Sequence, residues 1–172
     1  MNHHATDSQV RIEPATIDDV PELTPLMTRA FDDGSRRFRG IEKGGPPGYD
    51  NGEFLRKWMP MGTAFKVSVN NRIAGSFILF LENPDDGANW VGNIFIDPEY
   101  QSLGIGQEVM AYIHETYPAE IWRLETPEWS TRNHHFYERC GYRKVNEYLD
   151  EDEGIISFVF ERTTISAAES SS

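Results

Sequence analysis

The chain has 172 residues, of which 38% are hydrophobic, 12% aromatic and 26% charged, a composition typical of a soluble globular protein with a real core. Its net charge of -12 repels phosphate backbones and anionic headgroups, so we expect neither a nucleic-acid nor a membrane partner. The single cysteine, Cys140, excludes an intramolecular disulfide. Because no apolar run approaches the ~18 residues of a membrane span or forms a signal-peptide core, we expect a cytoplasmic protein.

The two ends of the chain are small, polar and aperiodic. They predict a disordered N-terminus over residues 1–9 and a disordered tail over residues 163–172, around one domain at residues 10–162. The N-terminal pair His3 and His4 has no third ligand near it in the sequence. We therefore expect no metal site.

The first part of the domain predicts a strand followed by two helices. A short strand is expected at residues 10–14, and Thr16 then provides an N-cap with acidic residues in the first turn of a helix. Apolar residues at three-and-four spacing carry this helix to about Phe31. The Gly-, Pro- and charge-rich residues 32–51 predict a long loop, and a short helix is expected at about residues 51–59.

The rest of the domain predicts strands with two further helices. Two strands are joined across Asn70-Asn71, whose tolerance of left-handed backbone suits a tight hairpin, and a third strand covers residues 90–96. A helix at residues 104–117, a strand at 121–125 and a helix at 130–140 follow, and a hairpin across the acidic turn 150–154 closes the chain. This order predicts one mixed α/β (α+β) domain.

The segment YQSLGIGQEVM, residues 100–110, resembles a phosphate-binding turn at a helix N-terminus. It fails as a dinucleotide motif because Val109 replaces the third glycine, and it fails as a P-loop because Gln107 stands where Lys is required. Successive unpaired backbone N–H groups at a glycine-rich helix start still form a nest for an anion. A pyrophosphate fits such a nest, although a plain helix-start turn is the alternative for this segment alone.

A second motif supplies the context for the first. FIDPEYQSLGIG is followed about thirty residues later by FYERCGY, and together they resemble the Gcn5-related N-acetyltransferase (GNAT) superfamily. That family has a pyrophosphate loop of the pattern Gln/Arg-x-x-Gly-x-Gly/Ala, and a later helix that ends in aromatic-Tyr-Glu-Lys/Arg-x-x-Gly-aromatic. The resemblance extends loosely over residues 10–161 and implies a central, mostly antiparallel sheet of six to seven strands flanked by about four helices.

The resemblance implies acetyl-CoA as co-substrate and no metal. The pyrophosphate of acetyl-CoA would be held by Gln101, Ser102, Leu103, Gly104, Ile105, Gly106 and Gln107. The pantetheine arm of acetyl-CoA would run beside the strand that contains Ile94, Phe95 and Ile96. This strand would diverge from the next strand at a bulge, for which Gly92 is well placed. The backbone N–H of Phe95 or Ile96 would donate to the oxyanion that develops at the thioester.

Tyr137 is the expected catalytic residue, since the resemblance implies that a phenol donates to the leaving thiolate. A buried packing tyrosine is the alternative. Phe136 and Asn133 share its helix face and are expected to contact the cofactor. Where the family often has an Asn seven residues before this Tyr, the chain has Ser130, so either Ser130 or Asn133 could contact the pantetheine. Cys140 is expected to pack, because no base lies beside it in the sequence and the family transfers acetyl directly to the amine.

The general base and the acceptor stay open. Relatives often carry a Glu in the strand that here reads NWVGNIFI and has no carboxylate, which leaves a water chain, Glu82 or Glu125 as alternatives. The arginine-rich residues 34–48 could bind acceptor or cofactor, or be solvated. We expect an N-acetyltransferase for a primary amine of a small molecule; a protein or peptide N-acetyltransferase and a non-catalytic acetyl-CoA sensor are the alternatives. Relatives commonly dimerise, so the resemblance admits a homodimer.

Overall fold

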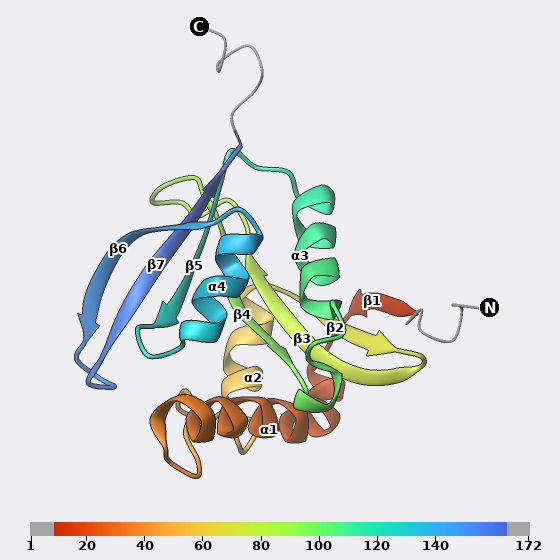
Figure 1. The fold of residues 1–172 in the computed structure, drawn as a ribbon. Helices are drawn as coiled ribbons and strands as arrows, with labels where there is room; N and C mark the ends of the chain where they lie inside the picture. Colours follow the sequence, from red (N-terminus) through yellow and green to blue (C-terminus); the bar gives the residue numbers. More distant parts are fainter. Residues whose placement is uncertain (1–8, 165–172) are drawn as a thin grey trace, which may run out of the picture.

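The structure is a computed structural model that describes residues 9–164. It contains one sheet of seven strands in the order β1-β2-β3-β4-β5-β7-β6 (Figure 1). All neighbours are antiparallel except β4 and β5, which are parallel. In chain order the strands are β1 (Val10–Pro14), β2 (Thr63–Val69), β3 (Arg72–Phe80), β4 (Asn89–Ile96), β5 (Ile121–Pro127), β6 (Arg143–Asp150) and β7 (Ile155–Thr163). The expected mixed α/β, mostly antiparallel fold is confirmed.

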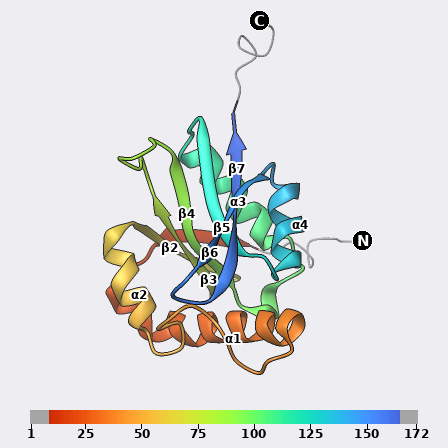
Figure 2. The ribbon, with the colours of Figure 1, turned by 90° about the vertical axis from the view of Figure 1, so that its left-hand side faces the viewer.

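Four helices cover the two faces of the sheet. They are α1 (Val20–Arg39), α2 (Glu53–Trp58), α3 (Ile105–Thr116) and α4 (Thr131–Arg139), with short 3-10 turns η2 (Ile17–Asp19), η3 (Met59–Met61) and η4 (Pro98–Tyr100). Figure 2 shows α2 on one side of the sheet and α3 and α4 on the other, with α1 lying across its end. In the described part of the chain, no helix is long and apolar enough to cross a membrane.

Each face of the sheet has its own apolar core. On the α1/α2 face, Leu23, Met27 and Leu55 pack with Ile78 and Phe95 of the sheet. On the α3/α4 face, the core includes Val109, Ile113, Phe77, Trp122, Phe160 and Tyr137. These two cores fix which strand side chains face α1 and α2 and which face α3 and α4.

Helix α1 runs eight residues beyond the expected end at Phe31 and finishes at Arg39. The charged residues expected to form a loop instead form a solvated helical face, on which Arg37 pairs with Asp33 one turn earlier at 3.1 Å. Asp32 and Ser35 of this extension are buried and hydrogen-bond the following segment, as shown by Ser35 Oγ donating to the Gly44 carbonyl at 2.8 Å. The helix stops at Gly40, which has a left-handed φ of 67°.

Three smaller expectations also have an outcome. Thr16 and Asp19 form a reciprocal capping box at the expected helix start. The turn between β2 and β3 has positive φ at both Asn70 and Asn71, as predicted. Strand β7 ends at Thr163, one residue beyond the expected end of the domain, while the disorder expected at residues 1–8 and 165–172 lies outside the described residues.

The sheet opens between β4 and β5. These strands pair at only three positions, Asn89–Val91 with Trp122–Leu124, and the rest of β4 has no partner on that side (Figure 1). The opening coincides with a bulge: Ile78 and Leu79 of β3 face Asn93 and Val91 of β4, so Gly92 is the extra residue. A Cβ on Gly92 would lie 2.1 Å from the Phe80 ring, which explains why glycine is needed there.

Candidate functional site

The free edge of β4 presents backbone groups to the opening in the sheet. The Asp97 N–H donates to Ala74 of β3 at 2.7 Å, and hydrogen-bonding direction alternates along an antiparallel strand. Phe95 therefore also faces β3, whereas the peptide groups of Ile94 and Ile96 face the opening. The Ile96 carbonyl accepts from Gln101 Nε2 at 3.0 Å on that side. Of the two N–H groups proposed for the oxyanion, Ile96 is the one that the register directs toward the opening.

The turn between β4 and α3 exposes a run of backbone N–H groups. Ser102 and Gly104 have left-handed φ angles of 68° and 79°, and α3 begins directly after Gly104. Within residues 9–164, none of the N–H groups from Ser102 to Gln107 has a hydrogen-bond acceptor. Such a run at a helix N-terminus, with the helix dipole behind it, is the arrangement that binds phosphate groups.

The two sequence motifs meet at the start of α3. A Cβ on Gly106 would lie 3.0 Å from the Phe136 ring of α4, so the glycine lets that ring pack directly on the first turn of α3. Ile105 beside it is buried in the core and anchors the same turn. The structure thus brings Gly106 and Phe136 together, as expected, while Leu103 is 56% exposed and its side chain makes no part of the core.

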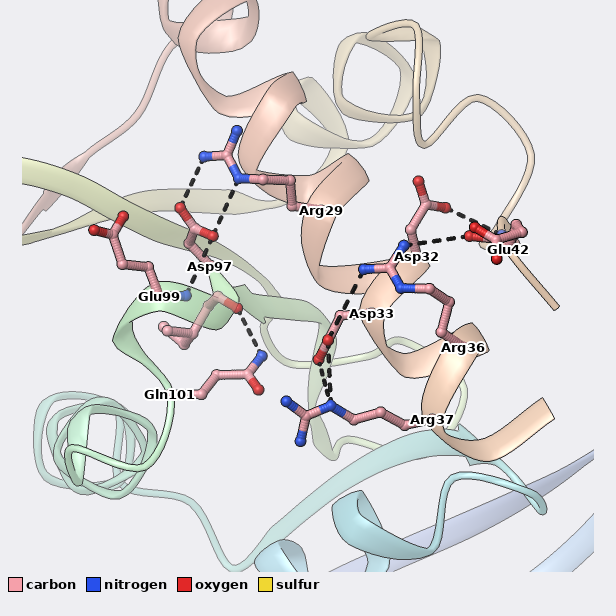
Figure 3. A network of polar contacts seen from close by, with 11 residues as sticks. Arg29, Asp32, Asp33, Arg36, Arg37, Glu42, Asp97, Glu99 and Gln101 are labelled. Carbon is pink, nitrogen blue, oxygen red and sulfur yellow. Dashed lines mark hydrogen bonds and ion pairs between the residues drawn. The ribbon is translucent and has the colours of Figure 1, made fainter. Parts of the chain in front are cut away.

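An ion pair that the sequence did not reveal holds the other end of this turn. Asp97, at the end of β4, is 3% exposed and accepts two hydrogen bonds from Arg29 of α1, as Figure 3 shows. Its carboxylate also accepts from the N–H of Glu99 at 3.5 Å. The sequence marks Asp97 only as the end of a strand, because its pairing with a residue 68 positions earlier leaves no local signal.

Tyr137 belongs to α4, and its side chain lies in the apolar core on the α3/α4 face of the sheet. It is 7% exposed, packs against Phe136, Tyr142 and Phe160, and its hydroxyl has no hydrogen-bond partner in the described part of the chain. Burial raises the pKa of Tyr137 above that of a free phenol, so its hydroxyl is protonated at neutral pH and available as a donor.

The two candidates for the pantetheine contact differ in burial. Ser130 is 5% exposed at the start of α4 and makes no side-chain capping hydrogen bond. Asn133 lies exposed on the first turn of the same helix. Ser130 is therefore enclosed by the fold, whereas Asn133 is exposed to solvent.

The arginine-rich segment is largely paired with its own surroundings. Arg36 and Arg37 lie within 4.0 and 3.1 Å of Asp33, and Arg36 also donates to the Glu42 carbonyl (Figure 3). Arg39 lies over the Trp129 ring, 5.0 Å from its centre. These contacts support the solvated-surface interpretation for Arg36 and Arg37.

The two acidic alternatives for the base occupy different places. The Glu82 N–H donates to the Asn89 side chain at the start of β4, at the other end of this strand from the turn that leads into α3. Trp122 and Leu124 of β5 face α3 and α4, and Glu125, which follows Leu124, points to the opposite face. This is the α1/α2 face of the sheet. Glu125 accepts a hydrogen bond from the Tyr148 hydroxyl at 2.6 Å, which raises the pKa of Tyr148 to about 12.

A cavity of about 190 Å³ opens on the same face, beside the bulge. Its lining comes from α2, β3 and β4 and consists of Phe54, Trp58, Ile78, Phe80, Gly92 and Asn93. The Asn93 Oδ1 atom is buried and has no hydrogen-bond partner in the described chain. No sequence pattern predicted this cavity, because its walls come from three segments that meet only in the fold. Within residues 9–164, no group of His, Cys, Asp and Glu is arranged to hold a metal ion.

Comparison with known proteins places this geometry in a family. Residues 27–142 match the model of the acetyltransferase (GNAT) family. The chain is 26% identical over 144 residues to the uncharacterized protein YrkN of Bacillus subtilis (strain 168), covering 83% of this chain and 77% of that protein.

Solved structures share the fold at low identity. An acetyltransferase from Thermus thermophilus has a TM-score of 0.70 at 15% identity, covering 91% of this chain and 97% of the other. A GNAT family acetyltransferase from Elizabethkingia anophelis, solved with acetyl-CoA bound, has a TM-score of 0.65 at 15% identity and coverages of 90% and 98%. The ribosomal-protein-S18-alanine N-acetyltransferase of Escherichia coli has a TM-score of 0.62 at 15% identity and coverages of 92% and 96%. The chain therefore belongs to the GNAT family of N-acetyltransferases, enzymes that transfer an acetyl group from acetyl-CoA.

Proposed function

We propose that this enzyme transfers the acetyl group of acetyl-CoA directly to the primary amine of a small molecule. The observation that carries the small-molecule assignment is the cavity of about 190 Å³ beside the bulge in β4. A cavity of this size accepts a group of a few heavy atoms, whereas a folded protein acceptor needs an open groove. Its position next to Asn93 puts an acceptor beside the free edge of β4.

Acetyl-CoA would be held by the chain's own backbone. The free N–H groups from Ser102 to Gln107 suit the pyrophosphate, and the free edge at Ile94 and Ile96 suits an extended pantetheine. Backbone donors of this kind are required because the protein's net charge of -12 opposes a polyanionic ligand. Gln101 already braces this turn against Ile96 through its side chain.

The chemistry requires an amine without its extra proton, a donor for the oxyanion and a donor for the thiolate. We assign the oxyanion donor to the Ile96 N–H and the thiolate donor to the Tyr137 hydroxyl. Because the raised pKa of Tyr137 makes full proton transfer to a thiolate unfavourable, Tyr137 stabilises the leaving sulfur by hydrogen bonding. Glu125, on the cavity's side of the sheet, receives the proton that the ammonium loses.

The test measures cofactor binding and turnover separately. Isothermal titration of acetyl-CoA into the full chain is expected to show micromolar-range binding, and a panel of small primary amines is expected to release coenzyme A. Absence of acetyl-CoA binding would contradict the proposal. Binding without coenzyme A release from any amine or peptide would instead indicate a sensor of acetyl-CoA.

A protein or peptide acceptor is the second candidate. Tyr148 and Leu149 of the edge strand β6 are 42% and 58% exposed, and an extended peptide could lie on such a surface. Faster coenzyme A release with N-terminal peptides than with any small amine would favour this candidate.

A further inference from the structure

We infer that the acceptor is an arylalkylamine, a primary amine joined by a short chain to one aromatic ring, whose ring fills the cavity beside Gly92 and whose amino group donates to Asn93 Oδ1. The inference rests on the proposed function and adds the class of the acceptor. It is carried by the size and chemistry of the cavity walls, by one buried acceptor atom, and by the charges near the cavity.

The cavity has the size and the surface for one ring. Four of its walls are the hydrophobic side chains of Phe54, Trp58, Ile78 and Phe80, and its volume is about 190 Å³. An apolar cavity of about 150 Å³ in another protein takes up benzene, so a single ring with a short chain fits here. Phe54 and Trp58 lie 6.3 Å apart in a tilted pair, and Trp58 and Phe80 lie 6.1 Å apart edge to face. A further ring can pack among them in the same way.

Asn93 supplies the polar end of the site. Its side-chain oxygen is buried without a partner in the described chain, and a buried acceptor of this kind is favourable only when a donor reaches it. Asn93 lines the cavity and precedes Ile94, whose peptide group faces the opening, so an amino group bound to its oxygen is held close to the opening. The amide accepts a hydrogen bond from the amine and leaves the deprotonation to another group.

The charges near the cavity disfavour a diamine or polyamine. None of the six lining residues is acidic, so a second ammonium group in the cavity would be buried without a counter-charge. The Lys57 ammonium already lies 4.7 Å from the centre of the Trp58 ring and repels another cation there. The overall charge of -12 attracts the single ammonium of the acceptor, while the cavity selects its uncharged ring.

Direct binding tests the acceptor class without depending on turnover. We would titrate 2-phenylethylamine and 1,4-diaminobutane into the full chain, with and without coenzyme A, by isothermal calorimetry. We expect 2-phenylethylamine to bind at least tenfold more tightly than the diamine. Asn93→Ala should weaken its binding about tenfold, while Met61→Ala, a change at a 66% exposed residue close to α2, should leave it unchanged.

A variant with a larger cavity should gain affinity for a larger amine, a result that misfolding cannot produce. Phe80→Leu enlarges the cavity, so tryptamine should gain at least fivefold in affinity relative to 2-phenylethylamine. Diamine binding as tight as that of 2-phenylethylamine would overturn the inference, as would binding insensitive to both Asn93→Ala and Phe80→Leu. Coenzyme A release with aliphatic amines alone would overturn the inference but leave the proposed function standing. Cavity binding of 2-phenylethylamine without acetyl-CoA binding would support the cavity assignment and overturn the proposed function.

Discussion

Arg29 of α1 donates two hydrogen bonds to Asp97, from Nε at 3.2 Å and from Nη2 at 2.8 Å, and ties this helix to the end of β4. Asp97 is almost fully buried, whereas the Arg29 side chain is 54% exposed. The pair fixes the point where β4 stops and the turn toward α3, the proposed pyrophosphate site, begins. The first helix therefore helps to position a site made by residues about 70 positions later in the chain.

We predict that Arg29→Ala lowers the free energy of unfolding by about 1–3 kcal/mol, because it leaves a buried carboxylate without its cation. It should also weaken acetyl-CoA binding, since the turn after Asp97 loses its anchor. Urea denaturation and calorimetry measure the two effects. Arg37→Ala is the matched control: Arg37 pairs with Asp33 on the exposed face of the same helix, and its loss should cost less than about 0.5 kcal/mol. Equal losses in the two variants would contradict the anchoring role.

Much of the fold could be predicted because its signals are local. The Asn70-Asn71 turn, the Thr16 cap and the bulge at Gly92 each depend on a few adjacent residues, or on a motif of the family. The expected end of α1 was wrong because Gly34 and a run of charges resembled a loop. Burial of Asp32 against Tyr49, whose hydroxyl donates to it at 2.6 Å, outweighs that local preference and is visible only in the fold.

For the same reason, one part of the candidate site could be predicted from the sequence and another part could not. Residues 102–107 and Tyr137 belong to contiguous motifs, so the sequence alone was enough to propose them as site residues. The Arg29–Asp97 pair, the Glu125–Tyr148 hydrogen bond and the cavity at Asn93 join segments that no sequence spacing connects. The preference for the Ile96 N–H over that of Phe95 needed the strand register.

The proposed pyrophosphate site at residues 102–107 gives a prediction that separates the effect of backbone strain from that of a steric clash. Gly104 has φ 79°, and a Cβ added there would meet nothing within 4 Å, so Gly104→Ala causes no clash but strains the backbone by about 1–2 kcal/mol. We expect it to weaken acetyl-CoA binding at least tenfold, as measured by calorimetry, because the neighbouring N–H groups turn away. Gly34→Ala, also without a clash but inside α1, should instead stabilise the protein by about 0.5–1 kcal/mol. Unchanged cofactor affinity in Gly104→Ala would argue against the anion nest.

The proposed role of Tyr137 as donor to the thiolate predicts that loss of its hydroxyl changes turnover and not cofactor binding. Tyr137→Phe should lower kcat by about tenfold to a hundredfold while the Kd for acetyl-CoA changes less than twofold, because the hydroxyl acts on the leaving thiolate. Tyr142→Phe is the control: it removes the hydrogen bond between Tyr142 and His114, so it should cost about 1 kcal/mol of stability and leave kcat unchanged. Steady-state kinetics with full turnover in Tyr137→Phe would return Tyr137 to a packing role.

The proposed role of Glu125 as general base predicts that its loss lowers kcat/KM in a pH-dependent way. Glu125→Gln should lower kcat/KM about a hundredfold at pH 7 and less as the pH approaches about 10, since the amine then loses its proton to solvent without help. The pH profile of coenzyme A release measures this recovery. Glu82→Gln, at the start of the loop that leads to β4, should leave the profile unchanged. If Glu82→Gln lowered kcat/KM and Glu125→Gln did not, Glu82 and not Glu125 would be the general base.

His114 gives the fold its own pH dependence. Burial, together with the charge of Arg162, lowers the pKa of His114 to about 4, and the ring lies 2.8 Å from the Tyr142 hydroxyl and against Trp122. The unfolded chain binds a proton at this residue below about pH 6.5, whereas the folded chain does not until about pH 4, so stability should fall as the pH drops through this window. Urea midpoints at about pH 7.5 and about pH 5 should differ less in His114→Gln than in the natural chain. The same difference should persist in His135→Gln, because the His135 side chain is 72% exposed; an equal pH dependence in all three proteins would show that His114 is not the group responsible.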